Sequence, residues 1–271
     1  MAGSIKADVA DAYTDESGVT LNQTRSEFGL SDPLDSVALA NGAYDAFVEL
    51  HIEQGPLLEQ QGIDIGIVTA IAAPAALRVD FEGAGGHAGA VLMKDRRDAL
   101  LPAAELALAV AAAADELGGE DTVATTGVLD VFPRAINSIP AKTHLEIDIR
   151  DTQLDRRDAV LQRVVDQANT IGQTHNQTTN VAIISKDPPV QCDAKIVAAI
   201  HAACNDADVR YQEMISRAYH DSLFMAQICP TAMVFIPCKD GISHRPDEYS
   251  SPKDIAQGVE VLARCLAELS R

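Results

Sequence analysis

Apolar and polar residues alternate along two stretches in the middle of the chain, with the period of a half-buried β-strand. These stretches are ALRVDFE at 76–82 and HLEIDIR at 144–150. Longer segments with a helical apolar period follow each of them. The pattern predicts four strands and two helices in the order β-α-β-β-α-β, the split unit of ferredoxin-like domains. The predicted ranges are 76–82, 98–117, 122–132, 143–150, 154–172 and 180–185.

The flanking segments have a different pattern, in which helices and strands alternate as in α/β domains. Residues 1–45 are polar and predict loops with one short helix near 19–29. The elements predicted around the middle are strands at 46–51 and 63–73, a helix at 193–206, a strand at 209–215, a helix at 221–228, a strand at 232–236 and a helix at 252–269. Asp187-Pro188-Pro189 is a stiff connection before the second group.

The two patterns together predict an α/β fold made of two domains. We expect residues 1–73 and 188–271 to form one α/β domain. Residues 74–187 are expected to form an inserted ferredoxin-like domain. Two helices on one face of its sheet would leave the other face or an edge available to a partner.

Composition narrows the class of protein. The chain has 271 residues, 47% of them hydrophobic and 4% aromatic, which is enough for an aliphatic core. Its net charge of -19 argues against nucleic acid and anionic membrane, which both attract a basic surface. An acidic surface serves solubility more often than binding. The five cysteines form no CxxC pair and predict reduced thiols, and the first 18 residues lack an apolar signal-peptide core.

Glu49-Leu50-His51-Ile52-Glu53 leads into Gln54-Gly55-Pro56 at the end of a predicted strand. The polar side chains at 49, 51 and 53 share one side of the strand, because side chains alternate. An imidazole at a strand end is a natural metal ligand, although an isolated histidine is more often unligated.

Gly83-Ala84-Gly85-Gly86-His87-Ala88-Gly89-Ala90 displays His87 as its one polar side chain. The glycines allow a tight turn and a close approach to a ligand. A turn with a solvated histidine is the alternative. The absence of a following lysine weakens a nucleotide-binding interpretation.

Two further groups of polar residues are candidates. Asn137 and Arg150 flank one predicted hairpin, where Arg150 suits a substrate carboxylate or, alternatively, a local ion pair with Asp148 or Asp151. His220 and His244 each lie in a loop after a strand, where α/β domains place their sites. His220 with Asp221 is either an oriented imidazole or a capped helix start.

Several of these motifs together resemble one family. ELHIEQGP (49–56), GGHAGAV (85–91), INSIP (136–140), HLEIDIRD (144–151), SRAYHDSLFMA (216–226) and GISHRPDEYSSP (241–252) occur in order. They are similar to the dinuclear metallohydrolases that include aminoacylases, N-carbamoyl-amino-acid hydrolases and allantoate amidohydrolases. The likeness runs from about residue 15 to the C-terminus. The stretches 67–93 and 215–226 resemble the plant-type ureidoglycolate amidohydrolases in particular, because the other two groups usually have Gly-His-Asp where this chain has Tyr219-His220-Asp221.

The resemblance implies that residues 1–73 and 188–271 are a catalytic, metal-binding domain of which only part is present, and that residues 74–187 are an inserted lid and dimerisation domain. It also implies a role for each matched residue. His51 and His244 match metal ligands, and two manganese or other divalent ions would be the cofactor. His87 matches a catalytic residue that reaches the active site of the partner subunit of a homodimer, polarises the scissile carbonyl and also contacts the substrate. The matched substrate contacts are Gln54, His87, Asn137, Arg150, Tyr219 and His220.

The implied reaction is hydrolysis of a small ureido-carboxylate, (S)-ureidoglycolate, to glyoxylate, ammonia and carbon dioxide during allantoin catabolism. Allantoate or an N-carbamoyl-L-amino acid is the alternative substrate, and an inactive dimerisation or binding fragment is the alternative of another class. Family members carry an H-x-D segment, a bridging Asp and a Glu-Glu pair, none of which matches here. We therefore expect the N-terminal part of the site to be missing and this chain alone to have little or no activity.

Overall fold

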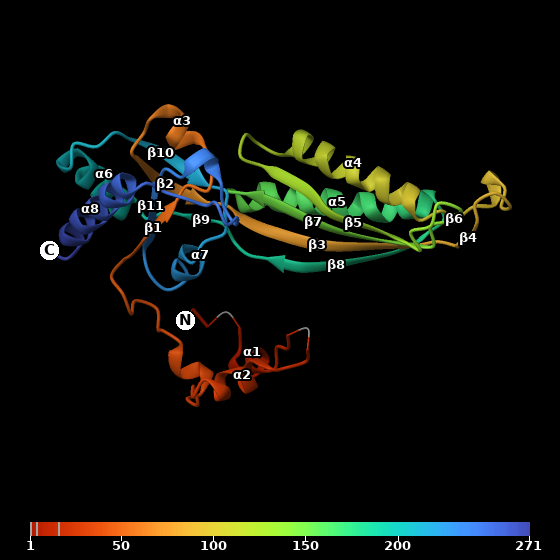
Figure 1. Ribbon diagram of the computed structural model, residues 1–271, viewed down its shortest axis with the longest axis horizontal. Coiled ribbons are helices and arrows are strands. Elements are labelled where there is room, and N and C mark those ends of the chain that lie inside the picture. The colour runs from red at the N-terminus through yellow and green to blue at the C-terminus, as the bar shows by residue number, and fades with distance from the viewer. Residues whose placement is uncertain (1, 4, 16) are drawn as a thin grey trace. The chain divides into compact units, whose positions relative to one another are not determined.

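The computed structural model describes residues 2–3, 5–15 and 17–271. The chain forms two compact units, drawn in Figure 1. Unit 1 contains residues up to Thr69, Cys192–Met214 and His220–Arg271, and unit 2 contains Ala70–Gln191 and Ile215–Tyr219. Among the helices of the described residues, none combines the length and the apolar composition needed to cross a bilayer.

The first part of unit 1 is a string of short elements: α1 (Ala7–Asp11), α2 (Leu21–Glu27) and the 3-10 helix η1 (Leu34–Val37). A capping box between Thr20 and Gln23 starts α2, which is the one helix that the sequence predicted here. The structure corrects that prediction by adding α1, whose five residues are too few for a clear apolar period.

The sheet of unit 1 has the order β1-β11-β2-β10, and β1 and β11 are parallel whereas β11 and β2 are antiparallel. Its strands are β1 (Phe47–Ile52), β2 (Ile65–Ile71), β10 (Tyr211–Ser216) and β11 (Thr231–Ile236), and the short β9 (Val190–Gln191) pairs with the end of β2. All four main strands were predicted from the sequence, but their mixed directions were not.

Two long helices, α6 (Ala194–Asp206) and α8 (Pro252–Leu269), pack against one face of this sheet through an aliphatic core. On α6 the side chain of Asp193 accepts hydrogen bonds from the first turn, and on α8 Ser251 does the same. Both helices agree with the sequence prediction. The short helix α3 (Leu57–Gln61) was not predicted.

Helix α7 is shorter than the predicted range of 221–228, because it covers only Ser222–Met225. After Met225 the chain forms a tight turn with backbone hydrogen bonds between residues three apart. The N–H of Gln227 donates to the carbonyl of Phe224, and the N–H of Ile228 donates to that of Met225. Helix α7 contacts β1 and β11, and Phe47 packs against the small buried cluster that Met225 forms with Ile228 and Cys229.

Unit 2 has the predicted β-α-β-β-α-β order, and its sheet order β5-β7-β3-β8 is that of a ferredoxin-like fold. Helices α4 and α5 pack on one face of the sheet through a single aliphatic core (Figure 1). Its elements are β3 (Ala73–Glu82), α4 (Leu100–Leu117), β5 (Val123–Phe132), β7 (Lys142–Asp151), α5 (Leu154–Thr174) and β8 (Thr178–Lys186).

Two small elements join the strands at one end of unit 2. The strands β4 (Gly86–His87) and β6 (Ser138–Ile139) pair with each other, which brings the loops on either side of them together. Two 3-10 helices complete the structure, η2 (Met93–Asp95) in unit 2 and η3 (Lys239–Gly241) in unit 1.

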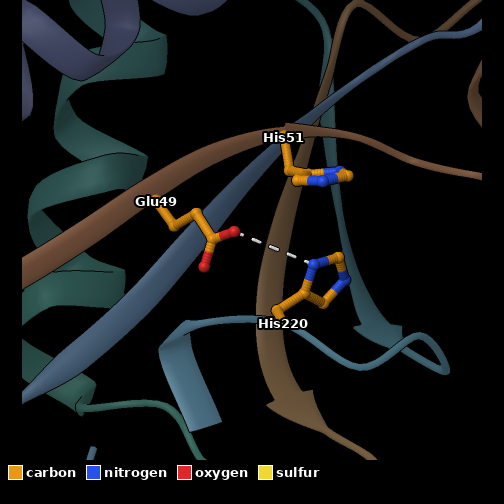
Figure 2. Close-up of side chains that lie close together, drawn as sticks. All are labelled: Glu49, His51 and His220. Atoms are coloured by element: carbon orange, nitrogen blue, oxygen red, sulfur yellow. Dashed lines mark ion pairs between the residues drawn. The ribbon is translucent and has the colours of Figure 1, made fainter. Parts of the chain in front are cut away.

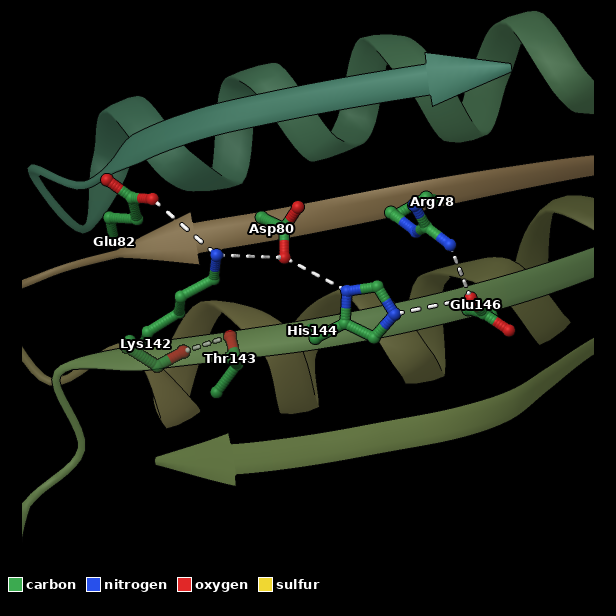
Figure 3. A network of polar contacts seen from close by, with 8 residues as sticks. Arg78, Asp80, Glu82, Lys142, Thr143, His144 and Glu146 are labelled. Carbon is green, nitrogen blue, oxygen red and sulfur yellow. Dashed lines mark hydrogen bonds and ion pairs between the residues drawn. The ribbon is translucent and has the colours of Figure 1, made fainter. Parts of the chain in front are cut away.

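The sheet face of unit 2 opposite α4 and α5 carries a network of charged side chains, shown in Figure 3. His144 contacts Asp80 through Nδ1 at 3.0 Å and Glu146 through Nε2 at 3.3 Å. Arg78 pairs with Glu146 at 3.0 Å, and Lys142 lies 3.6 Å from Asp80. Every second residue of β7 faces this way, so Arg150 is on the same face as the network.

Candidate metal and substrate site

Strand β1 has two faces with different chemistry. Val48, Leu50 and Ile52 pack into the core beneath α6 and α8. Glu49 and His51 alternate with them and therefore point to the side of the sheet where α7 lies.

Glu49 connects β1 to the start of α7. Its Oε2 accepts hydrogen bonds from the backbone N–H of Ser222 at 3.0 Å and from its hydroxyl at 2.6 Å. Its Oε1 lies 3.8 Å from Nδ1 of His220, and Figure 2 shows Glu49, His51 and His220 pointing toward one another. The carboxylate thus holds the loop that carries His220 against the strand that carries His51.

His51 and His220 lie edge to face, with ring centroids 4.7 Å apart. The side chain of His220 is 1% exposed, and burial, together with the nearby His51, lowers the pKa of its imidazole to about 4. His51 has its Nδ1 2.8 Å from the carbonyl oxygen of Ile52. Glu49, His51 and His220 each offer one ligand atom within 4.8 Å of the others, and among the described residues they are the one such group.

Gln54 and His244 meet at a second point of unit 1. The amide nitrogen of Gln54 donates to the hydroxyl of Ser243 at 2.8 Å and lies 3.5 Å from Nε2 of His244. The backbone N–H of His244 donates to Glu248, which helps to hold the pKa of that carboxyl below its usual range.

Gln54 and His244 are close because the loops that carry them pack tightly against each other. Gly241 has φ of +66°, and a Cβ there would come within 2.8 Å of the backbone of Gly55. A glycine is required at 241 for both reasons. The two segments ELHIEQGP and GISHRP, far apart in the sequence, are thereby placed side by side.

Glu53 has a structural role that the sequence did not reveal. Its side chain is buried and accepts hydrogen bonds from the backbone N–H groups of Leu57 and Leu58, at 2.9 and 2.8 Å. It therefore satisfies the first turn of α3 and fixes the turn after β1.

His87 lies in unit 2 as an exposed side chain on β4. Its Nδ1 accepts a hydrogen bond from the backbone N–H of Gly89 at 3.0 Å, so in the neutral ring the proton is on Nε2. The backbone N–H of Ala88 donates to the carbonyl of Asn137, which places Asn137 beside the same loop. His87 thus presents a fixed hydrogen-bond donor to its surroundings.

Arg150 and Tyr219 belong to unit 2 but to its other end. Arg150 binds both carboxylate oxygens of Asp148, at 2.8 and 3.2 Å, and the carbonyl of Arg217 at 3.0 Å. The local pair with Asp148 that the sequence left open is therefore present. The hydroxyl of Tyr219 donates to Asp187 at 2.8 Å, and burial together with this carboxylate raises the pKa of the phenol to about 12.

Sequence reasoning singled out His51 and His220 but assigned no role to Glu49 or Ser222. Because side chains alternate along a strand, the sequence indicates that Glu49 lies on the same face of β1 as His51. The bond to Ser222 bridges 173 positions, and no local pattern indicates it.

Comparison with known proteins shows which proteins this chain is similar to. The chain is 55% identical over 240 residues to ureidoglycolate hydrolase of Arabidopsis thaliana, a match covering 88% of this chain and 50% of that protein. It is 36% identical to an N-carbamoyl-L-amino-acid amidohydrolase of Paenarthrobacter aurescens, over 100% of this chain and 66% of that protein. The chain thus spans half to two thirds of these relatives.

Solved structures agree with these sequence matches. Crystal structures of AtUAH in complex with glyoxylate and with (S)-hydroxyglycine superpose with a TM-score of 0.88 at 50% identity, covering 99% of this chain and 65% of that one. The sequence model of peptidase family M20/M25/M40 matches residues 21–268. This chain is a member of peptidase family M20/M25/M40.

Proposed function

We propose that this chain is part of a metal-dependent amidohydrolase that converts (S)-ureidoglycolate to glyoxylate, ammonia and carbon dioxide. Residues 1–73 and 188–271 are its catalytic, metal-binding domain, and residues 74–187 are its lid and dimerisation domain. The observation that carries the proposal is the similarity to the Arabidopsis ureidoglycolate hydrolase, which covers 88% of this chain at 55% identity.

The donors around β1 fit a divalent ion. Because the Nδ1–H of His51 donates to the carbonyl of Ile52, the lone pair of Nε2 is available to a metal. We propose His51 and His244 as ligands and manganese as the metal, with two ions in the complete site. Divalent ions of this kind supply the Lewis acidity that makes water a nucleophile near neutral pH.

The substrate carboxylate and ureido group need several polar partners, and we propose Gln54, Asn137, Arg150, Tyr219 and His220. The contacts of Arg150 with Asp148 and Arg217 use three of its five N–H donors, so two remain for a substrate carboxylate. The hydroxyl of Tyr219 donates to Asp187, which fixes its orientation.

His87 is proposed to polarise the scissile carbonyl through its Nε2–H, acting in the site of a second copy. The end of β7 that carries Arg150 and the end near β4 are separated by about 27 Å of extended strand, from Lys142 to Arg150. A ureido-carboxylate is far shorter than this. His87 and Arg150 of one chain therefore serve different substrate molecules, which supports a homodimer.

Allantoate or an N-carbamoyl-L-amino acid is the second candidate substrate, supported by the 36% identity to the Paenarthrobacter enzyme. A substrate panel separates the candidates. Ammonia release from (S)-ureidoglycolate, allantoate and N-carbamoyl-L-amino acids is measured with manganese, for this chain and for a longer protein that also carries the family's H-x-D segment and Glu-Glu pair.

We expect the longer protein to turn over ureidoglycolate at least about tenfold faster than the others and the 271-residue chain to show little turnover. A faster rate with allantoate or a carbamoyl-amino acid would replace the proposed substrate. No turnover of any of them would favour a binding or dimerisation fragment.

The cross-subunit role of His87 has a separate test in the longer protein. The variants His87→Ala and Arg150→Ala are expected to be inactive alone. After unfolding and refolding as an equal mixture, half of the dimers contain one intact site, so about a quarter of the activity returns. No recovery in a mixture that forms heterodimers would place both residues in the same subunit's site.

A further inference from the structure

The segment between β3 and α4 carries His87 in a loop that is closed at its base. There the backbone N–H of Ala84 donates to the carbonyl of Arg97 at 2.8 Å, and β4 pairs with β6 at the same end of unit 2 (Figure 1). Further along the loop, the carbonyl of His87 accepts hydrogen bonds from the N–H groups of Ala90 and Val91, at 3.0 and 3.2 Å. The turn that follows His87 is therefore compact and bonded within itself.

Arg96 lies later in the same loop, and its half-buried guanidinium binds this turn. Its Nε donates to the carbonyl of Val91 at 3.0 Å, and its Nη2 donates to the carbonyl of Ala88. Both partners are backbone oxygens of the turn. Hydrogen bonds from a charged donor are stronger than those between neutral groups, so one side chain fixes two points of the turn.

The bond to Ala88 is made to the peptide group that also contacts the imidazole. The carbonyl of Ala88 and the N–H of Gly89 belong to one peptide unit, and this N–H donates to Nδ1 of His87 at 3.0 Å. A guanidinium on the carbonyl polarises the peptide and makes its N–H a stronger donor, because hydrogen bonds in a chain reinforce one another. Nδ1 accepts this bond only while it carries no proton, so the proton of the neutral ring stays on Nε2.

From this chain of contacts we infer that Arg96 is a positioning residue, which fixes the ring orientation and the tautomer of His87 through the peptide between Ala88 and Gly89. This role of Arg96 rests on the proposed function, in which the Nε2–H of His87 polarises the scissile carbonyl. It deepens that function, because it identifies the residue that keeps the proton on Nε2.

The rival explanation is that Arg96 only stabilises the loop, and that the imidazole of His87 behaves in the same way without it. Both explanations predict a less stable loop in the variant Arg96→Ala. They differ in the tautomer of His87. An imidazole without a fixed partner exchanges between its two neutral tautomers, so the tautomer changes in Arg96→Ala only if Arg96 controls the N–H of Gly89.

The first experiment measures the tautomer of His87 in the 271-residue chain and needs no enzymatic activity. Histidine labelled with ¹⁵N and long-range ¹H–¹⁵N correlation at about pH 8 give separate shifts for Nδ1 and Nε2. The variant His87→Gln assigns the signals of this ring among the seven histidines. The wild type should show the widely separated pair of nitrogen shifts of the Nε2–H form. In Arg96→Ala the two shifts should move toward each other, because both tautomers become populated.

Arg97→Ala is the matched control, since Arg97 is the next residue of the same loop. Its Nε donates to the carbonyl of Asn176 at 2.8 Å and not to the turn after His87. The control removes a charge and a backbone contact while Arg96 still binds the turn, so the His87 shifts should stay those of the wild type. Far-UV circular dichroism establishes that each variant is folded.

The second experiment uses the longer protein with manganese and (S)-ureidoglycolate. Arg96→Ala should lower kcat by about tenfold with little change in KM, which is less than the loss of about 10²–10³-fold that is typical when an oxyanion donor is removed outright. The imidazole of His87 remains in this variant, but its Nε2–H is present and correctly directed less often. Arg97→Ala should keep the kcat and KM of the wild type.

A single Nε2–H tautomer in folded Arg96→Ala would overturn the inference, and so would an equal change of tautomer in Arg97→Ala. A wild type in which His87 exchanges freely between both tautomers would overturn it without any variant, even if Arg96→Ala does not fold. In an active longer protein, an unchanged kcat of Arg96→Ala would also overturn it. The proposed function fails separately, if the longer wild type hydrolyses none of the substrates of the panel, because the tautomer is measured without substrate.

Discussion

Arg157 on α5 is a fully buried charged side chain, and its loss should weaken unit 2. Its Nε and Nη2 bind the carboxylate of Asp158 at 3.1 and 2.9 Å. Its Nη1 donates to the carbonyl of Asp187 and lies 3.5 Å from the carbonyls of Ala73 and Pro74. The guanidinium of Arg157 thus connects the first residues of β3 to the segment that follows β8.

The substitution Arg157→Met keeps most of the apolar stem and removes the charge. Removing one partner of a buried ion pair typically costs about 3–5 kcal/mol. The lower end applies, because Asp158 is 31% exposed and keeps Lys186 at 2.9 Å, and because the two 3.5 Å contacts are weak. We expect the free energy of unfolding of unit 2 to fall by about 3 kcal/mol.

For a unit of about 130 residues this loss lowers the unfolding midpoint by about 11 °C. Urea and thermal unfolding are followed by circular dichroism, and hydrogen exchange of the β3 and β8 amides assigns the change to unit 2. The control is Arg163→Met on the same helix, whose pair with Glu116 has side chains 39% and 61% exposed and is worth less than about 1 kcal/mol. Equal stability of the two variants would refute the reasoning.

Three further outcomes are expected from contacts inside each unit. Gly172→Ala should destabilise the chain by about 1–3 kcal/mol, because the added Cβ would lie 1.8 Å from the Thr179 hydroxyl. A Cβ at Gly127 meets no atom within 4 Å, so Gly127→Ala is the control and should be neutral. Similar denaturation midpoints for the two variants would contradict this. Asp151 is buried, and although burial raises its pKa, hydrogen bonds from Arg156, Thr122 and Gln153 lower it below its usual value. A lowered folded-state pKa adds stability above the unfolded pKa, so Asp151→Asn should cost about 2 kcal/mol at pH 7 and progressively less below about pH 4. A gap that does not shrink as the pH falls below about 4 would contradict this. Burial raises the pKa of Cys204 to about 12 and that of Cys265 to about 11, so a disulfide reagent at pH 8 should modify them only after unfolding, and fast labelling in the native chain would contradict their burial.

The sequence predicted most elements because their apolar faces are regular. Every second residue of β7 is buried, because only one face of this strand packs against α4 and α5. The sequence of β7 therefore alternates between apolar and polar residues, which is the pattern that predicted the strand. Short elements escaped prediction. The five-residue α3 depends on Glu53 capping its start, and the end of α7 depends on the turn after Met225, so neither contains enough periodic positions to be recognised.

The candidate site was predictable only one segment at a time. His51 and His244 were recognisable from their motifs, and the resemblance to a family grouped them without any distance. The contacts of Glu49 with Ser222 and His220 depend on how the end of one strand meets a loop more than 170 positions away. Such contacts arise from tertiary packing, and no periodicity within either segment specifies them.

The sheet of unit 2 sets a constraint that any use of its polar residues must obey. Ten successive residues of β7 pair with β3, so Lys142 and Arg150 are held a fixed distance apart. Arg150 is at the end where Ala73 begins β3, whereas β4 with His87 follows the opposite end of that strand. On the open face between them lies the network of Arg78, Asp80, His144 and Glu146, in which two ion pairs, Arg78–Glu146 and His144–Asp80, join β3 to β7. Since His87 and Arg150 lie at opposite ends of this sheet, the proposed reaction would take the two residues from two copies of the chain, and the refolded mixture of His87→Ala and Arg150→Ala measures whether it does.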